Sequence, residues 1–141
     1  MTKINVKSLF ISSAAVWIVS YLTLTASYAM PLMKDPVLQG SWLLSIILIP
    51  FSFLGAHLYY RKGHKTNGFL LGAMMFLVYL LLDVLVTVPT LIGPFDANAY
   101  MAFFANFNYW FLGLELIAIV AVFWQFKVGL FENEDPNFQN L

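Results

Sequence analysis

Four long apolar stretches, separated by short polar segments, make up most of the chain. They cover residues 8–28, 42–60, 67–89 and 104–127. A helix crosses about 30 Å of hydrocarbon with about 20 mainly apolar residues, so each stretch is long enough to span a bilayer. Their apolar residues follow one another without the strict alternation of a half-buried strand. The pattern therefore predicts an all-α integral membrane protein with four transmembrane helices.

Short connections between the stretches favour consecutive helices packed antiparallel, as an up-down-up-down four-helix bundle. We expect residues 1–130 to form this single transmembrane domain. Residues 131–141 carry three acids and a proline. They are predicted to form a polar cytoplasmic tail.

Composition narrows the class of protein further. Apolar residues make up 61% of the chain and charged residues 10%, whereas a soluble domain is about 45–50% apolar and about 25% charged. Seven basic and seven acidic residues cancel, so the chain has no basic field for nucleic acid, which is not an expected partner. The chain has no cysteine, which excludes disulfides and thiolate-bound metals. No metal site and no cofactor are predicted.

Basic residues are distributed unequally between the two ends of the predicted bundle. Six fall on one side of an alternating four-span arrangement: Lys3, Lys7, Arg61, Lys62, Lys65 and Lys127. Only Lys34 falls on the other side. Because cytoplasmic loops carry the excess of Lys and Arg, both termini are predicted to be cytoplasmic. We expect a multi-pass protein of the cell inner (plasma) membrane.

The beginning of the chain also has features of a secretory signal, since two lysines precede an apolar run that ends near small residues. That run is longer than the 7–15 residues usual for the apolar part of such a signal. We therefore expect it to be retained as the first membrane anchor.

Two carboxyl groups lie inside the predicted spans. Asp83 lies about 24 Å, and Glu115 about 18 Å, from the predicted cytoplasmic surface at 1.5 Å per residue. An acid at the centre of a membrane helix costs about 2.5–3.5 kcal/mol on insertion scales. No basic residue of the spans lies at that depth, so the two acids would not both stay ionised if they meet. They are predicted to form either a binding centre for a cation, proton or ligand, or a structural hydrogen bond between helices.

Hydroxyl groups accompany the first of these acids. Tyr79 and Thr87 lie four residues before and after Asp83, on the same helical face. On the first stretch Ser13, Ser20 and Ser27 recur every seven residues and are expected to face the bundle interior. Tyr79 and Thr87 are therefore candidate ligand-binding residues. The serines are expected mainly to bond the carbonyls of their own helix.

Pro50, near the middle of the second stretch, cannot donate a backbone hydrogen bond and crowds the carbonyl of Ile46. It predicts a kink, which is either purely structural or a hinge. His57 is expected to be a hydrogen-bonded side chain at the membrane surface.

Several segments together resemble one family of small four-span bacterial inner-membrane proteins, a family catalogued only as a domain of unknown function. They are LYYRKGHKTNG at 58–68, LDVLVTVP at 82–89, the pair Tyr109-Trp110, and Glu115. The resemblance implies a bacterial inner membrane and a four-helix fold. It implies no activity.

Three functional hypotheses follow. The first is a non-enzymatic bundle that binds or passes a small cation, proton or amphiphilic ligand, with Asp83 and Glu115 as its polar centre. The second is an accessory or assembly subunit of a larger membrane complex, with itself or other membrane subunits as partners besides the lipid bilayer. The third is a membrane-embedded enzyme that acts on a lipid or quinone. It is the least favoured, because no nucleophile, metal set or cofactor motif accompanies the acids.

Overall fold

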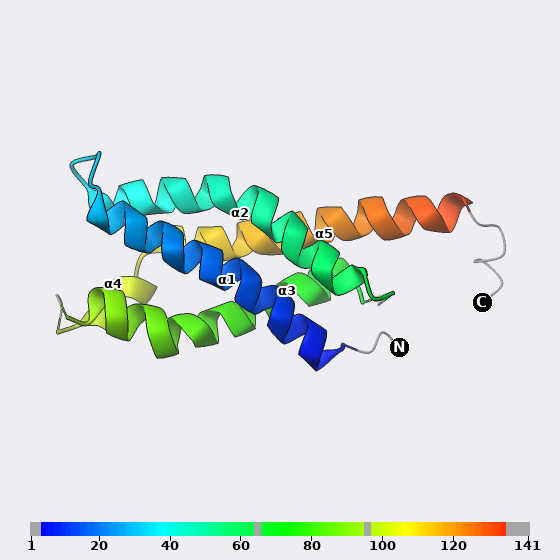
Figure 1. Ribbon diagram of the computed structural model, residues 1–141, viewed down its shortest axis with the longest axis horizontal. Coiled ribbons are helices and arrows are strands. Elements are labelled where there is room, and N and C mark those ends of the chain that lie inside the picture. Colours follow the sequence, from blue (N-terminus) through cyan, green and yellow to red (C-terminus); the bar gives the residue numbers. More distant parts are fainter. Residues whose placement is uncertain (1–3, 64–65, 95–96, 135–141) are drawn as a thin grey trace.

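The computed structural model describes residues 4–63, 66–94 and 97–134, and these residues form helices without strands (Figure 1). In chain order the elements are α1 (Val6–Ala29), α2 (Pro36–Tyr60), α3 (Gly68–Leu82), η1 (Asp83–Ile92), α4 (Ala99–Phe104) and α5 (Phe107–Glu134). Four helical segments are long and apolar enough to cross a membrane: Val6–Ala29, Leu38–Tyr60, Gly68–Ile92 and Phe107–Lys127. The predicted helical class and the four candidate spans are therefore confirmed.

The ends of the helices differ from the predicted ones where proline or a short extra helix intervenes. α2 begins at Pro36 rather than at residue 42, because a proline at the first helical position lacks only an N–H that would have no partner there. The third span continues past Pro89 to Ile92 as the π-helical segment η1. The fourth begins at Phe107, after α4, and its helix extends to Glu134. The rest of the predicted tail lies outside the described residues.

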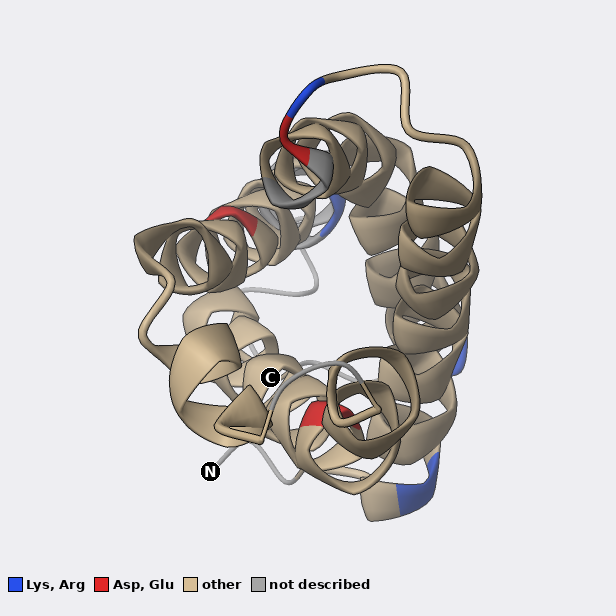
Figure 2. Ribbon diagram, turned by 90° about the vertical axis from the view of Figure 1, so that its left-hand side faces the viewer, with Lys and Arg blue, Asp and Glu red and all other residues tan. Residues whose placement is uncertain are grey.

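The four long helices form a ring in which consecutive helices run in opposite directions (Figures 1 and 2). α1 packs along α2 and α3, and α5 packs along the same two helices. The order around the ring is therefore α1, α2, α5, α3, and α2 lies diagonally across from α3. Consecutive helices were expected to be neighbours throughout, but α2 and α3, although consecutive, do not pack along each other.

Glycines bring α3 and α5 into close contact. A Cβ atom on Gly68 would lie 2.9 Å from the Cα atom of Ala121, and one on Gly72 would lie 2.8 Å from the Cα atom of Ile117. These two glycines are four residues apart and thus on one face of α3. Small residues at this spacing let membrane helices approach backbone to backbone.

The apolar core fills the end of the bundle that contains the beginning of α1, which we call the closed half. Its buried side chains come from all four long helices and include Leu9, Val16, Tyr59, Leu71, Met75 and Val120. The Tyr59 hydroxyl shares a hydrogen bond of 2.7 Å with the Thr66 hydroxyl and accepts one of 3.2 Å from the Asn5 amide. These three polar groups are therefore satisfied between the helix ends that meet there, whereas Ser12 Oγ and Trp124 Nε1 in the same half are buried without a hydrogen-bond partner among the described residues.

The serines of α1 face the interior, as predicted. Ser13, Ser20 and Ser27 are each at most 2% exposed. Ser13 donates to the Leu9 carbonyl at 2.7 Å, and Ser20 donates to the Val16 carbonyl at 2.9 Å. Two of the three hydroxyls thus bond to their own helix.

Pro50 lies within α2, and its side chain is exposed on the outside of the bundle. Figure 1 shows α2 changing direction about halfway along its length. Pro50 follows Leu48, which lines the cavity, and precedes Ala56 and Tyr59 of the packed core, so it lies where the helix passes from the open half to the closed half.

Candidate functional site: a cavity around Asp83

The opposite end of the bundle, which we call the open half, contains a cavity of about 680 Å³. Its walls come from the last turns of α1, the first half of α2, the end of α3, η1, α4 and the first half of α5. Apolar and aromatic side chains dominate these walls, among them Leu44, Leu48, Phe76 and Phe103. Pockets of this size and character are typical of sites for small organic molecules.

Beside this cavity the third span changes from an α-helix to a π-helix at Asp83. Within it the Gly93 amide donates to the Val88 carbonyl, five residues back, at 2.7 Å. Pro89 has no amide hydrogen and cannot continue the α-helical bonding pattern. α1 packs on α3, whereas η1 packs against α4. π-helical segments occur frequently at functional sites.

Asp83 is the carboxylate in the wall of this cavity, and its side chain is 3% exposed. Its Oδ1 atom accepts hydrogen bonds from Trp17 Nε1 at 3.0 Å and from the Thr87 hydroxyl at 2.6 Å. Its Oδ2 atom accepts one from the Tyr109 hydroxyl at 2.9 Å. All three donors are neutral, and no described cation contacts the carboxylate. Because a carboxylate oxygen has two lone pairs, Oδ2 can accept one further hydrogen bond.

The three donors come from three parts of the bundle. Trp17 lies on α1, Thr87 on η1 and Tyr109 on α5, so the carboxylate links helices that otherwise diverge in the open half. The Trp17 ring also packs on Tyr21 at a centroid distance of 5.3 Å. The Tyr21 hydroxyl in turn shares a 2.9 Å hydrogen bond with that of Thr90 on η1. Side-chain bridges thus hold α1 beside η1.

The other residues predicted near Asp83 lie in the same cavity wall. Tyr79 and Thr87 both line the cavity, and both are buried. The structure therefore brings together three of the four candidate ligand-binding residues.

Glu115 is not part of this cavity. Its half-buried carboxylate accepts a hydrogen bond of 2.9 Å from the Ser45 hydroxyl of α2, while its neighbour Leu116 lines the cavity. The Tyr109 side chain points to Asp83. Glu115 lies six residues after Tyr109 on the same helix, so its side chain points about 240° further around the helix axis. The expectation of one shared carboxylate centre is therefore not met, because equal depth in the membrane does not place two groups on facing sides.

Trp17 and Tyr109 were not predicted as part of the site. In the sequence, Trp17 shares the stripe of inward-facing serines and Tyr109 lies in the resemblance segment before Glu115. Each carries one hydrogen-bond donor that needs a partner in hydrocarbon, and this requirement is the signal that could have linked them to the intramembrane acid.

Among residues 4–63, 66–94 and 97–134, no group of three or more His, Asp or Glu side chains is placed to hold a metal ion. Comparison with known proteins gives no match to a family model, to a curated protein or to a solved structure.

Proposed function

We propose that this protein binds a small amphiphilic ligand in the open half of the bundle, with a cationic group of the ligand against Asp83. One observation carries the proposal: a buried carboxylate whose described partners are all neutral forms part of the wall of a large, mainly apolar cavity. An uncompensated carboxylate at membrane depth is costly and by default indicates a functional site. A ligand cation would supply the missing charge.

The shape and lining of the cavity favour an organic cation over a bare metal ion. A metal ion bound by oxygen needs several oxygen ligands gathered at one point. The walls also carry hydroxyl groups, but those of Thr87 and Tyr109 donate to Asp83 and most of the wall surface is apolar. Aromatic rings cluster beside the carboxylate, with the Phe103 and Tyr109 centroids 4.8 Å apart. Ring faces attract organic cations. The packed core of the closed half favours binding over passage through the bundle.

We further propose that both termini lie in the cytoplasm and that the membrane is a bacterial inner membrane. The basic residues Lys7, Arg61, Lys62 and Lys127 belong to one end of the bundle and Lys34 to the other, which supports this orientation. The choice of membrane rests on the resemblance seen in the sequence alone, since no family model matches the chain. In this orientation the open half faces away from the cytoplasm.

Ligand binding can be tested through Trp17, whose indole N–H donates to Asp83. In a variant with Trp42, Trp110 and Trp124 replaced by Phe, the remaining tryptophan fluorescence reports on the site. None of these three lines the cavity. The protein is placed in lipid nanodiscs and titrated with decylammonium, and 1-decanol serves as the uncharged probe. We expect saturable binding of decylammonium and much weaker binding of decanol.

Asp83→Asn should lower the affinity for decylammonium about 10- to 100-fold, because a hydrogen bond to a charged group contributes about 1.5–3 kcal/mol. Asn can still accept from Trp17 and Thr87, so the fold should be retained. Glu115→Gln is the matched control and should bind as the parent does. Equal affinity of the Asp83→Asn variant, or equal binding of decanol, would contradict the proposal.

A second candidate, an accessory subunit of a larger membrane complex, is favoured by the polar groups on the outside of α2 and α5. Ser45 and Asn108 line a smaller groove of about 160 Å³ between these helices, and Glu115 bonds to Ser45 beside it. Polar side chains at membrane depth are typical of contacts between membrane helices. Gentle extraction followed by mass measurement should then yield a reproducible hetero-complex that Glu115→Ala weakens.

A further inference from the structure

Basic side chains of α2 and α5 meet on the outer surface of the closed half, far along both helices from the cavity. The Nδ1 atom of His57 on α2 lies 3.3 Å from the Nζ atom of Lys127 on α5. Arg61 lies four residues after His57 and therefore on the same side of that segment. The structure thus joins the side chains of His57 and Lys127 from two helices, with Arg61 one turn further along the chain.

No described acid balances this cluster. The acids with described side chains are Asp35, Asp83 and Glu115, and all three belong to the open half. If the Lys127 ammonium donates to His57 Nδ1, the imidazole presents Nε2–H outward. The remaining ammonium hydrogens and the Arg61 guanidinium are donors too. The cluster is therefore an array of donors without a described anionic acceptor.

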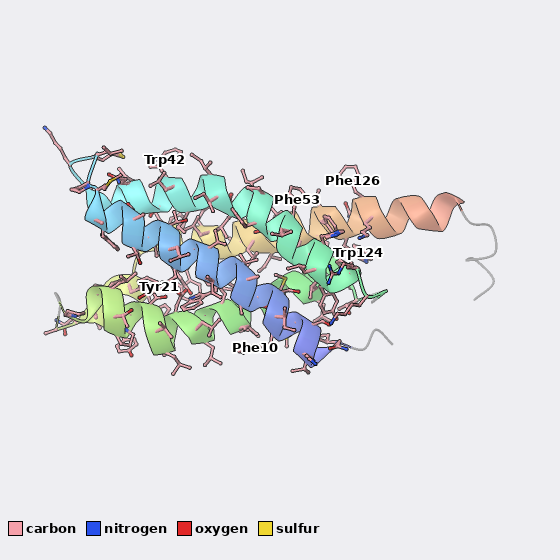
Figure 3. All side chains as sticks on the ribbon, viewed as in Figure 1. Phe10, Tyr21, Trp42, Phe53, Trp124 and Phe126 are labelled. Atoms are coloured by element: carbon pink, nitrogen blue, oxygen red, sulfur yellow. The ribbon has the colours of Figure 1, made fainter. Side chains whose placement is uncertain are left out.

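The surface next to the cluster is aromatic. The Lys127 ammonium lies over the Phe123 ring at 5.5 Å from its centroid, and the His57 ring meets that ring edge-on. Phe53 of α2 packs on Phe123 at 6.0 Å. Figure 3 shows Phe53 and Phe126 on the same side of the bundle, where they are 37% and 64% exposed. An apolar surface therefore adjoins the basic cluster along the membrane-spanning part of the helices.

We propose that His57, Arg61 and Lys127 bind the phosphate of an anionic phospholipid whose acyl chain lies along Phe53 and Phe126. A free anion would use the basic groups alone, whereas a phospholipid uses both parts of this surface. The cluster also lies where Leu38–Tyr60 and Phe107–Lys127 end, which is the depth of lipid headgroups. Basic pockets between membrane helices are known to hold such headgroups.

The test compares phosphatidylglycerol with phosphatidylcholine of the same acyl chains, added to the detergent-solubilised full chain and measured by native mass spectrometry. We expect the anionic lipid to bind more tightly. Lys127→Gln and Arg61→Gln should each lower its affinity about fivefold, as expected for about 1 kcal/mol per basic side chain. Lys7→Gln on α1 removes the same charge from the same end of the bundle and should leave the affinity unchanged.

Three outcomes would overturn the inference: equal binding of the two lipids, parental affinity in the Lys127→Gln variant, or an equal loss in the Lys7→Gln variant. Displacement of the lipid by millimolar inorganic phosphate would also overturn it, since the site would then recognise a soluble anion. A thermal melting curve for each variant separates loss of the site from loss of the fold.

Discussion

The two halves of the bundle use the same four long helices but differ in the charge of the polar groups that they bury. In the closed half the hydroxyls of Tyr59 and Tyr60 bond to Thr66, and the side chains around them pack without a large cavity. In the open half a carboxylate bonds to neutral donors at the wall of a cavity of about 680 Å³. The closed half even buries the neutral Ser12 hydroxyl and Trp124 N–H without a described hydrogen-bond partner. The comparison teaches that it is the charge of Asp83 without a described counterpart, and not an unpaired neutral group, that marks a candidate binding site.

The largest expected effect concerns which half faces the cytoplasm. The chain has no cysteine, so single cysteines can be introduced at the exposed positions Lys34 and Lys62, at opposite ends of the bundle. With a membrane-impermeant maleimide on intact cells, we expect Lys34→Cys to be labelled and Lys62→Cys to be labelled only after lysis. The reverse result would place the open half on the cytoplasmic side.

The next largest effect is expected on the free energy of unfolding, which glycine substitutions in the two halves should change by different amounts. Gly72→Ala in the closed half places a Cβ against the backbone of Ile117. A backbone cannot move aside easily, so the free energy of unfolding should fall by about 1–3 kcal/mol. Gly113→Ala instead meets the ring of Phe76, which lines the cavity and has room to turn.

For Gly113→Ala the change should stay within about 1 kcal/mol, because the higher helix propensity of alanine offsets the shift of the ring. Unfolding in mixed detergent micelles measures both variants. A loss at Gly113 equal to that at Gly72 would show that the open half is packed as tightly as the closed half.

Some of these structural features could be predicted from the sequence and others could not. The four spans follow from apolar runs alone, because length and hydrophobicity decide membrane insertion. Asp83 could be singled out because acids are rare in hydrocarbon. The order of helices around the ring could not be predicted from connection length. The pair Gly68 and Gly72 was nevertheless a signal for close packing of α3 on a neighbour.

The partners of Asp83 were out of reach for a different reason. Trp17 and Tyr109 come from other helices, and their directions depend on how each helix is rotated in the bundle. The side-chain direction of Glu115 could not be predicted either. Its predicted depth resembles that of Asp83, but its carboxylate bonds to Ser45 of α2, on a different side of α5 from Tyr109. Sequence spacing gives the faces of one helix, but packing decides which faces meet.

Removal of one hydroxyl from each half gives a matched pair with a smaller effect. Tyr59→Phe removes the two hydrogen bonds that the Tyr59 hydroxyl makes with the Thr66 hydroxyl and the Asn5 amide, so stability should fall by about 1–2 kcal/mol. Binding of decylammonium should not change. Tyr109→Phe removes the donor to Asp83 Oδ2 and should change the affinity for decylammonium with less effect on stability. The halves would not be functionally distinct if both variants changed both properties equally.

The smallest effect is expected at Pro50, where α2 passes from one half to the other. Pro50→Ala restores an amide that can bond to the Ile46 carbonyl, and the exposed position leaves room for the change. Hydrogen exchange of the amides in this part of α2 should slow, while the affinity for decylammonium should stay within about twofold. If the affinity instead changes as much as in Asp83→Asn, then the bend in α2 sets the shape of the cavity. In that case Pro50 acts as the hinge that its position in the sequence suggested, and the direction in which α2 leaves the closed half determines the shape of the cavity in the open half.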